Sequence, residues 1–384
     1  MARFPAFSSA GAATPASIFA RLREHLARFQ ASGGGDVIPL QIGDTYLPPA
    51  ARLDEVTWTE MPPSELYAYG SPNGWAPLVD AIAAKAQRRN GIDAGAGGVQ
   101  VTCGATHALS CAVAALLDPG DELILMTPYW PLIRGIALGR NVVPVEVPYG
   151  DAAALARAIT PRTAGIYYAT PNNPDGAMLD AGALAAVVDL AVQRDLWIFA
   201  DEVYEDYVYD GAHLSAAALP GGAARTVTVF SFAKSFAQAG LRVGYALGPE
   251  PVIATIKKLV NHSVYNVPVA MQRAAHAALL ADRSAFLDGA LARYRAARDR
   301  ARTRLAAPTT LPPGGAYLWL DLRPWSPDGD CMSLLERFAA RGVLIAPGNA
   351  FGSTHGAFAR LCFTGVPPDR LDEGIDRINA VLAG

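Results

Sequence analysis

Lys234 is the residue of this chain whose surroundings most strongly indicate covalent chemistry. It stands in the nearly uncharged run SFAKSFAQAGLRVG, directly after the apolar, β-branched segment 227–230. A lysine that ends a buried strand is partly desolvated, which lowers the pKa of its amine and frees the lone pair to attack a carbonyl carbon. Ser231 and Arg242 flank it in the same run, and a hydroxyl and a guanidinium suit a phosphate. A surface lysine in a loop is the simpler interpretation of Lys234 taken alone.

Small residues follow the predicted strand 99–103. Gly104, Ala105 and Thr106 close this strand and open a helix, so their backbone amides and the positive end of the helix dipole can bind an anion. An ordinary helix N-cap explains Thr106 equally well. At the end of another strand, the indole of Trp130 can stack on a flat heteroaromatic ring. A tryptophan buried in the core is the alternative there.

The segment Pro-Asn-Asn-Pro-Asp-Gly, residues 171–176, follows the predicted strand 164–169. Its two prolines fix the backbone on either side of the asparagines. The rigid amide of Asn173 can therefore hydrogen-bond a phenolic oxygen with little loss of entropy. A plain turn is the alternative, and it does not exclude this role.

Asp201 comes straight after the apolar strand 197–200, and a carboxylate in that position needs a partner. A pyridinium N–H would serve, because the aspartate would then keep the ring protonated. Tyr204 lies three residues further on and can reach the ring oxygen of the same ligand. Capping of the next turn is the alternative explanation of Asp201.

These clusters together supply a phosphate site, a partner for a ring nitrogen, partners for a phenol oxygen, a stacking face and an attacking lysine. Pyridoxal 5′-phosphate (PLP) requires all of them. The chain resembles the fold-type I PLP-dependent enzymes, specifically the class I and II aminotransferases related to aspartate and aromatic aminotransferases. The resemblance runs from about Gly43 to the C-terminus. It rests on the spacing Lys-x7-Arg with serine at −3, the turn Asn-Asn-Pro-x-Gly and the pair Asp-x-x-Tyr, which occur in family order.

The resemblance implies a role for each of these side chains. Lys234 forms the internal aldimine with PLP and later moves the α-proton of the substrate. Asp201 pairs with the pyridine nitrogen, and Asn173 and Tyr204 hold the 3′-oxygen. Trp130 stacks on the ring.

The resemblance alone assigns the remaining site residues. The phosphate is bound by Ser231, Arg242 and the amides of Gly104, Ala105 and Thr106. Tyr69 matches a tyrosine that reaches the phosphate of the neighbouring subunit, which implies a homodimer. Arg360 matches the arginine that clamps the substrate α-carboxylate, and Gly43 and Asn173 are the other expected substrate contacts. No metal is expected.

The implied activity is transfer of an amino group from an L-amino acid to a 2-oxo acid by a ping-pong mechanism. The same residues would also serve a PLP-dependent lyase, cyclase, decarboxylase or oxidase. A PLP-sensing transcription regulator would need a DNA-binding domain, and the segment before Gly43 is too short and not basic enough for one. A nicotinamide-binding Rossmann protein is disfavoured because no GxGxxG motif opens the first βα turn.

Several positions depart from the pattern of the family. Thr170 and Asp175 replace the commoner Asn and Thr around Asn173, and the loop after Gly43 lacks the usual Pro-Asp. No second arginine can be assigned to a side-chain carboxylate, so an aspartate preference is not supported. If Asp44 lines the pocket, it favours a cationic or polar amino acid. The other candidate lining residues are Tyr46, His107 and Tyr265.

The elements that must position these residues form an α/β pattern. From Val99 onward, short and nearly continuous apolar segments alternate with helical ones. This predicts a fold-type I transferase whose large domain has a mostly parallel seven-stranded sheet flanked by helices. The expected strands are 99–103, 122–126, 142–147, 164–169, 197–200, 227–232 and 242–247.

The chain is expected to divide into three parts. Residues 1–43 form an N-terminal segment and helix that pack with the small domain, 44–282 form the large PLP-binding domain, and 283–384 form a smaller α+β domain. An arginine-rich helix, 293–305, is expected to present its arginines to solvent rather than to nucleic acid.

Composition points to a cytoplasmic enzyme. The 384 residues are 51% hydrophobic and 17% charged, and the net charge of −3 gives no indication of nucleic acid or an anionic membrane as a partner. The four cysteines are scattered, without a CxxC pair, as expected of reduced core residues. No apolar run is long enough for a membrane span. The N-terminus resembles a disordered start more than a signal peptide.

Overall fold

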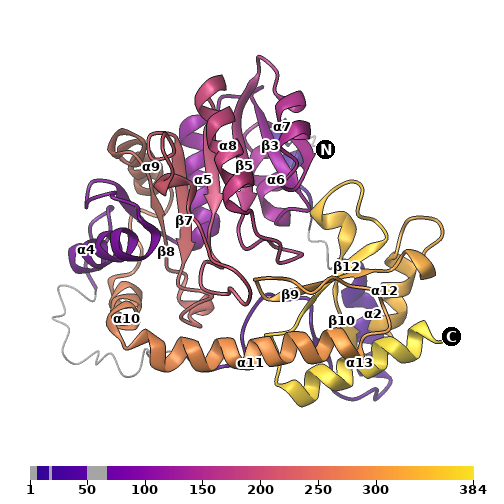
Figure 1. Ribbon diagram of the computed structural model, residues 1–384. Helices are drawn as coiled ribbons and strands as arrows, with labels where there is room; N and C mark the ends of the chain where they lie inside the picture. Colours follow the sequence, from indigo (N-terminus) through magenta and orange to yellow (C-terminus); the bar gives the residue numbers. More distant parts are fainter. Residues whose placement is uncertain (1–6, 17–19, 50–66) are drawn as a thin grey trace, which may run out of the picture.

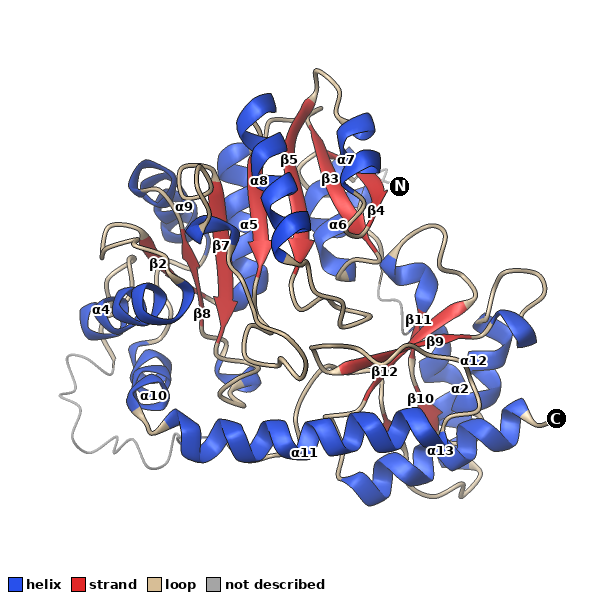
Figure 2. Ribbon diagram, in the orientation of Figure 1, coloured by secondary structure: helices blue, strands red, loops and turns tan. Residues whose placement is uncertain are grey.

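The computed structural model describes residues 7–16, 20–49 and 67–384. Its largest element is a seven-stranded sheet with the strand order β2-β8-β7-β6-β5-β3-β4 (Figures 1 and 2). Within this sheet β8 runs antiparallel to both of its neighbours and the other pairs are parallel. The strands are β2 (Val99–Thr102), β3 (Glu122–Thr127), β4 (Val143–Pro148), β5 (Thr163–Ala169), β6 (Trp197–Asp201), β7 (Thr226–Ser231) and β8 (Gly244–Leu247). The predicted mostly parallel sheet is thereby confirmed, with every strand within two residues of its expected bounds.

Helices cover both faces of this sheet, which explains why its strands are apolar almost throughout. Along β3, Leu123 and Leu125 pack toward one set of helices, while Ile124 and Met126 pack toward another. This alternation follows from the pleat, which points successive side chains to opposite faces. The first set is α5 (Gly104–Leu116), α6 (Pro131–Leu138) and α9 (Glu250–Ser263), and the second is α7 (Ala152–Ala158) and α8 (Ala181–Arg194).

At the β2 end of the sheet, α4 (Ala76–Lys85) and α10 (Val269–Leu280) pack together against a third apolar cluster. A π-helical turn, η2 (Ala86–Asn90), extends α4. The hydrogen-bond pattern changes at this turn, but the backbone stays helical across the junction, since Lys85 keeps helical dihedral angles.

A smaller antiparallel sheet, β11-β12-β9, lies beside the large one (Figure 2). Its strands are β9 (Tyr317–Asp321), β11 (Ala346–Pro347) and β12 (Phe358–Cys362). A parallel pair, β1 (Ile38–Pro39) and β10 (Val343–Leu344), joins the N-terminal region to this part of the chain. The helices here are α2 (Ala20–Ala31), α12 (Met332–Ala339) and α13 (Pro368–Leu382). The long helix α11 (Arg283–Arg304) runs beneath both sheets (Figure 1).

Two expectations about helices are wrong. Part of the N-terminus expected to be disordered forms a short helix, α1 (Ser9–Ala13), which Ser8 caps and which contacts α6. The arginines of α11 do not all face solvent: Arg298 is only 2% exposed and donates to Asp210 and to the carbonyl of Pro312, at 2.7 Å each. Pairing with a carboxylate compensates the free-energy cost of burying this charged side chain.

Among the helices in the described ranges, none is long and apolar enough to cross a membrane.

Candidate active site

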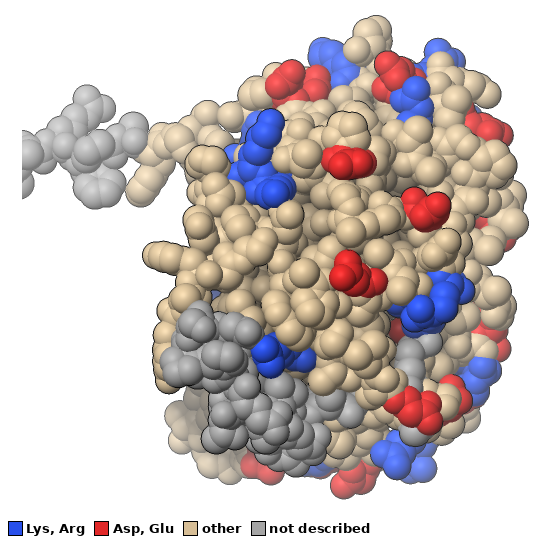
Figure 3. Space-filling model, turned by 90° about the vertical axis from the view of Figure 1, so that its left-hand side faces the viewer, with Lys and Arg blue, Asp and Glu red and all other residues tan. Residues whose placement is uncertain are grey.

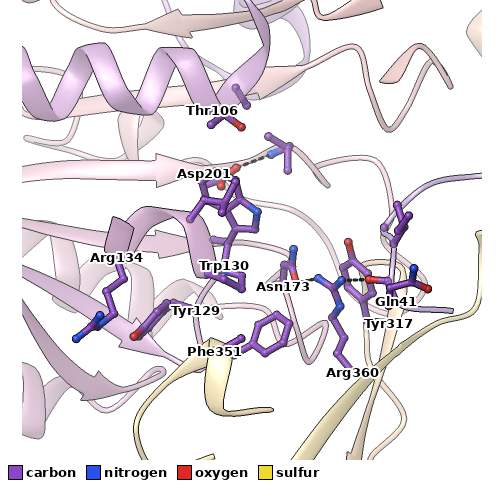
Figure 4. Close-up of a pocket in the computed structure, with 18 of the residues that line it drawn as sticks. Gln41, Thr106, Tyr129, Trp130, Arg134, Asn173, Asp201, Tyr317, Phe351 and Arg360 are labelled. Carbon is purple, nitrogen blue, oxygen red and sulfur yellow. Dashed lines mark hydrogen bonds between the residues drawn. The ribbon is translucent and has the colours of Figure 1, made fainter. Parts of the chain in front are cut away.

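A cavity of about 960 Å³ lies where the carboxyl ends of the parallel strands face the small sheet. Figure 4 shows Trp130, Asn173 and Asp201 in its wall, with Arg360 approaching from the small sheet. Of the predicted site residues, the lining contains Gly43, Ala105, Thr106, Trp130, Asn173, Asp201, Tyr204, Ser231, Lys234, Arg242 and Arg360. Residues far apart in the sequence therefore share one cavity. Gly104 lies just behind this wall, and Tyr69 lies elsewhere.

The amine of Lys234 donates to the backbone carbonyl of Gly43 at 2.5 Å and lies 5.5 Å from the centre of the Tyr204 ring. Burial lowers the pKa of this amine. Lys85 is more deeply buried than Lys234, but its amine forms an ion pair with Glu205. No such carboxylate contacts the amine of Lys234 within the described residues. The lysine in the cavity is therefore the one prepared to act as a nucleophile.

Asp201 ends β6, and its carboxylate is buried at the cavity wall. It accepts a hydrogen bond from the Tyr167 hydroxyl at 3.0 Å and a longer one from the backbone N–H of Val203 at 3.4 Å. Burial raises the pKa of Asp201 to about 6. A cationic N–H donor in the cavity would offset the free-energy cost of burying the charged carboxylate and would keep Asp201 ionised.

Arg360 on β12 is 6% exposed and is held by two acceptors. Its guanidinium donates to Oδ1 of Asn173 at 2.7 Å and to the carbonyl of Gln41. It also lies over the ring of Tyr317, 4.2 Å from the ring centre. Its buried Nε has no hydrogen-bond partner among the described residues. Because both acceptors fix the side chain in place, the remaining N–H groups are available for a carboxylate.

The hydroxyl of Tyr204 forms a short hydrogen bond with that of Tyr317. Gly43 lies against both hydroxyls, and a Cβ at this position would overlap Tyr317. The glycine is thus required for the loop 41–43 to approach the two tyrosines closely.

The expected anion site lies at the N-terminus of α5. Gly104 has a φ of +76°, and a Cβ there would lie 2.6 Å from Nη2 of Arg242. The guanidinium of Arg242 therefore lies directly against the first turn of the helix. The hydroxyl oxygen of Ser231 accepts from the N–H of Ala233 at 3.0 Å, which leaves its own proton free for an anion.

Comparison with known proteins agrees with this geometry. The profile of the family "Aminotransferase class I and II" matches residues 36–378. The chain belongs to this family. It is 34% identical to the aspartate/prephenate aminotransferase of Thermus thermophilus over 328 residues, which cover 82% of this chain and 83% of that one.

Two further relatives extend the comparison. The arginine–pyruvate transaminase of Pseudomonas aeruginosa is 34% identical over 341 residues, covering 85% of this chain and 86% of that protein. The structure of a double mutant of Thermus thermophilus aspartate aminotransferase superposes with a TM-score of 0.91 at 30% identity, covering 98% of this chain and 100% of that one. The chain is accordingly a PLP-dependent aminotransferase of fold type I, and transamination is favoured over the lyase, cyclase or oxidase alternative.

The residues present fit the family's cofactor. A buried carboxylate with few partners, an amine that no carboxylate of the described residues contacts and an arginine against a helix N-terminus are what a pyridinium, an aldehyde and a phosphate would each need. Lys234, Asp201 and Arg242 line one cavity, as PLP would require.

Three residues singled out in the sequence, Asp175, His107 and Asp44, do not line the cavity. Asp175 does not line the cavity; its carboxylate accepts from the Asn172 amide at 2.8 Å and the N–H of Ala177 at 3.1 Å, closing the turn. His107 is bound between the N–H of Cys103 and the hydroxyl of Ser263. Asp44, although its charge acts on Lys234, is exposed and outside the lining.

Several site residues were missed from the sequence. Tyr167 supports Asp201 from β5. The sequence offered only a tyrosine inside the expected strand 164–169, and its register opposite Phe199, two residues before Asp201, is seen only in the structure. Tyr317 contacts both Tyr204 and Arg360, and only its position after a proline- and glycine-rich turn hinted at it.

Gly43→Ala is expected to lower activity at least about tenfold and to reduce stability by about 1–3 kcal/mol, because the added methyl group would force Tyr317 and Tyr204 apart. Steady-state kinetics and thermal unfolding would measure both effects. Gly240→Ala is the matched control, since its Cβ would meet nothing within 4 Å. Wild-type activity in the Gly43 variant would show that the loop moves freely and would contradict this packing.

Proposed function

We propose that Lys234 is the residue that joins PLP and carries the proton of the reaction, while Arg360 binds the substrate. The observation that carries this proposal is that Lys234, without a carboxylate partner in the described chain, shares one cavity with the buried carboxylate of Asp201. PLP, when bound, supplies an electron sink that stabilises negative charge at the substrate α-carbon.

Each of these side chains then has a separate role in the reaction. The guanidinium of Arg360 binds the α-carboxylate with the N–H groups that Asn173 and Gln41 leave free. Once the substrate amine has displaced it, the amine of Lys234 takes the α-proton and returns it, aided by its lowered pKa. Asp201 keeps a proton on the ring nitrogen.

The other assignments follow the same geometry. Asn173 and Tyr204 hydrogen-bond the 3′-oxygen, and Trp130 lies over the ring. The phosphate is bound by Ser231, Arg242 and the amides of Gly104, Ala105 and Thr106. The same set of contacts serves both half-reactions, in which first an amino acid and then a 2-oxo acid occupies the site.

We further propose that the enzyme is a homodimer in which Tyr69 completes the partner's phosphate site. Tyr69 is 86% exposed, lies 4.9 Å from the ring of Tyr265 and does not line the cavity of its own chain. The face that carries α4 and α10 shows few charged residues in its described part (Figure 3). Large exposed apolar side chains there, including Tyr67, support burial against a second copy.

The proposal also covers the division into domains and the cellular location of the protein. The division into a segment 1–43, a large domain 44–282 and a small domain 283–384 is supported by separate apolar clusters around the large sheet and around β9 and β12. A cytoplasmic location is supported by the four cysteines, all of which are free.

A mixing experiment tests the shared site. Tyr69→Phe is expected to weaken PLP binding about tenfold, since one hydrogen bond to the phosphate is lost. When that variant and Lys234→Ala are unfolded, mixed and refolded at limiting PLP, mixed dimers contain one intact site, and activity should return to about a quarter of the wild-type value.

Refolding each variant alone is the control and should recover no such activity. Equal activity before and after mixing would place Tyr69 in the site of its own chain and contradict the proposal.

A further inference from the structure

Two charged residues of the cavity lining, Arg134 and Glu146, have no role in the proposed function. The other charged lining residues, Asp201, Lys234, Arg242 and Arg360, are assigned to the ring nitrogen, the covalent bond, the phosphate and the α-carboxylate. Arg134 lies in the first turn of α6, and Trp130 is the residue directly before this helix, at its N-cap. The unassigned pair therefore borders the place where the cofactor ring would stack.

Glu146 is already fully bonded within the protein. One carboxylate oxygen accepts from the Tyr129 hydroxyl at 2.8 Å, and the other accepts from the backbone N–H of Ser353 at 2.9 Å and from its hydroxyl at 2.6 Å. These hydrogen bonds and the nearby charge of Arg134 hold the pKa of Glu146 below its usual range. This carboxylate ties the loop at Ser353 to the large sheet and has little capacity left for a ligand.

Arg134 is in the opposite situation. It is exposed at the cavity surface, and no hydrogen bond or ion pair holds its guanidinium within the described residues. Glu146 attracts it without coming within the distance of an ion pair. A planar guanidinium with five free N–H groups is suited to bind a carboxylate through two parallel hydrogen bonds.

The two arginines lie at opposite ends of the cavity. Figure 4 shows Arg134 beside Tyr129 at one end and Arg360 beside Tyr317 at the other, with Trp130 and Asn173 between them. Arg134 follows Trp130 by four residues, with the first turn of α6 between them. A substrate held by its α-carboxylate at Arg360 would therefore need an extended side chain to reach Arg134.

Apolar residues also line the cavity close to Arg134. Leu132 lies two residues before it, and Pro15 packs beside Gly135, the residue after it. Such residues accommodate methylene groups, while the guanidinium offers an anionic group its hydrogen-bond donors.

We propose that Arg134 binds an anionic group at the far end of the substrate side chain, so that the preferred amino donors are α-amino dicarboxylates longer than aspartate. The proposal rests on the proposed function, because it takes Arg360 as the clamp for the α-carboxylate. It identifies the second arginine that could not be assigned from the sequence. A cationic side chain would instead be repelled by Arg134, and the neighbouring carboxylate of Glu146 already has its hydrogen-bonding capacity used within the protein.

Three amino donors with a six-carbon chain test the charge preference. L-2-aminoadipate, L-norleucine and L-lysine end in an anionic, a neutral and a cationic group, respectively. The wild-type protein should convert 2-aminoadipate with the highest kcat/KM in a single half-reaction without oxo acid. In Arg134→Gln the ratio of kcat/KM between 2-aminoadipate and norleucine should fall about tenfold, and Arg134→Lys should restore part of it.

Adipate gives a second readout that needs no turnover. This unreactive dicarboxylate should bind the PLP-loaded wild-type protein in a calorimetric titration about tenfold more tightly than it binds Arg134→Gln. Arg140→Gln, just beyond the end of α6 and outside the cavity lining, is the matched control for loss of one positive charge. It should behave as wild type in both measurements.

The outcomes separate this proposal from the assignment on which it rests. An unchanged ratio and unchanged adipate affinity in Arg134→Gln, with norleucine still converted, would overturn the Arg134 proposal and leave aminotransferase activity intact. A preference for lysine would also overturn it and point to Glu146 instead. If no donor were converted, the proposed function would fail, and adipate affinity would still decide whether Arg134 binds a dicarboxylate.

Discussion

Lys234→Ala is expected to slow amino-group transfer by at least about 10³-fold, because it removes both the covalent attachment of PLP and the base that moves the α-proton. The described residues give no substitute, since Lys85, the more deeply buried lysine, is paired with Glu205. The rate of a single half-reaction, followed by absorbance of the cofactor, measures this loss.

A matched control separates chemistry from folding. Lys258→Ala removes an exposed lysine on α9 and should retain wild-type rates and the wild-type unfolding temperature. Lys234→Ala should remain folded, because the wild-type amine is a buried group whose ionisation is opposed by its surroundings. A rate within tenfold of wild type in the Lys234 variant would refute its assignment.

Asp201→Asn is expected to have opposite effects on activity and on the stability of the cofactor-free protein. Activity should fall about 10²–10⁴-fold, because a neutral amide cannot keep the ring nitrogen protonated. At the same time the free energy of unfolding of the cofactor-free protein should rise by as much as about 3 kcal/mol at pH 8, because a carboxylate whose ionisation is opposed by burial is removed.

The pH dependence of that stabilisation follows from the raised pKa. The carboxyl of Asp201 has a pKa of about 6 in the folded protein and 3.8 as its reference value, so the folded state holds the proton more tightly. The protonated carboxyl of Asp201 therefore contributes fully to the stability of the folded protein below about pH 4. This contribution is lost as the pH rises through about 6. The difference between wild type and Asp201→Asn should be small at pH 4 and largest above pH 7.

Denaturant unfolding of the two cofactor-free proteins at several pH values measures this difference. Asp189→Asn, an exposed position on α8, is the control and should show no comparable gain. If Asp201→Asn were less stable than wild type at pH 8, the carboxylate would have to be stabilised by its protein contacts alone, contrary to the argument.

The sequence was most informative where chemistry and secondary structure coincide. Lys234 and Asp201 follow continuous apolar strands, and the parallel order of β6 and β7 brings them to one edge of the sheet. The start of α11 was less predictable, since this helix as a whole carries little hydrophobic periodicity. The residue Arg298 could not be recognised as buried because its partner, Asp210, is distant in sequence.

Cavity residues whose partners are distant in sequence were equally difficult to predict. Arg360 was found because its type matches a recurring motif, whereas Tyr317 and Arg134 required the three-dimensional arrangement of two sheets. Contacts between the small sheet and the loop 41–43 depend on where β1 pairs with β10, and a two-residue strand leaves almost no periodic signal in the sequence.

The most direct test of the central claim is the visible absorption spectrum of the PLP-loaded protein during addition of one amino acid without any oxo acid. The prediction is that the band of PLP joined to Lys234 converts to the band of the aminated cofactor, with one equivalent of 2-oxo acid released per site, and that a 2-oxo acid reverses the change. Product that accumulates beyond one equivalent while the first band persists, or the lack of any such band, would contradict the assignment of this chain as an aminotransferase acting through Lys234.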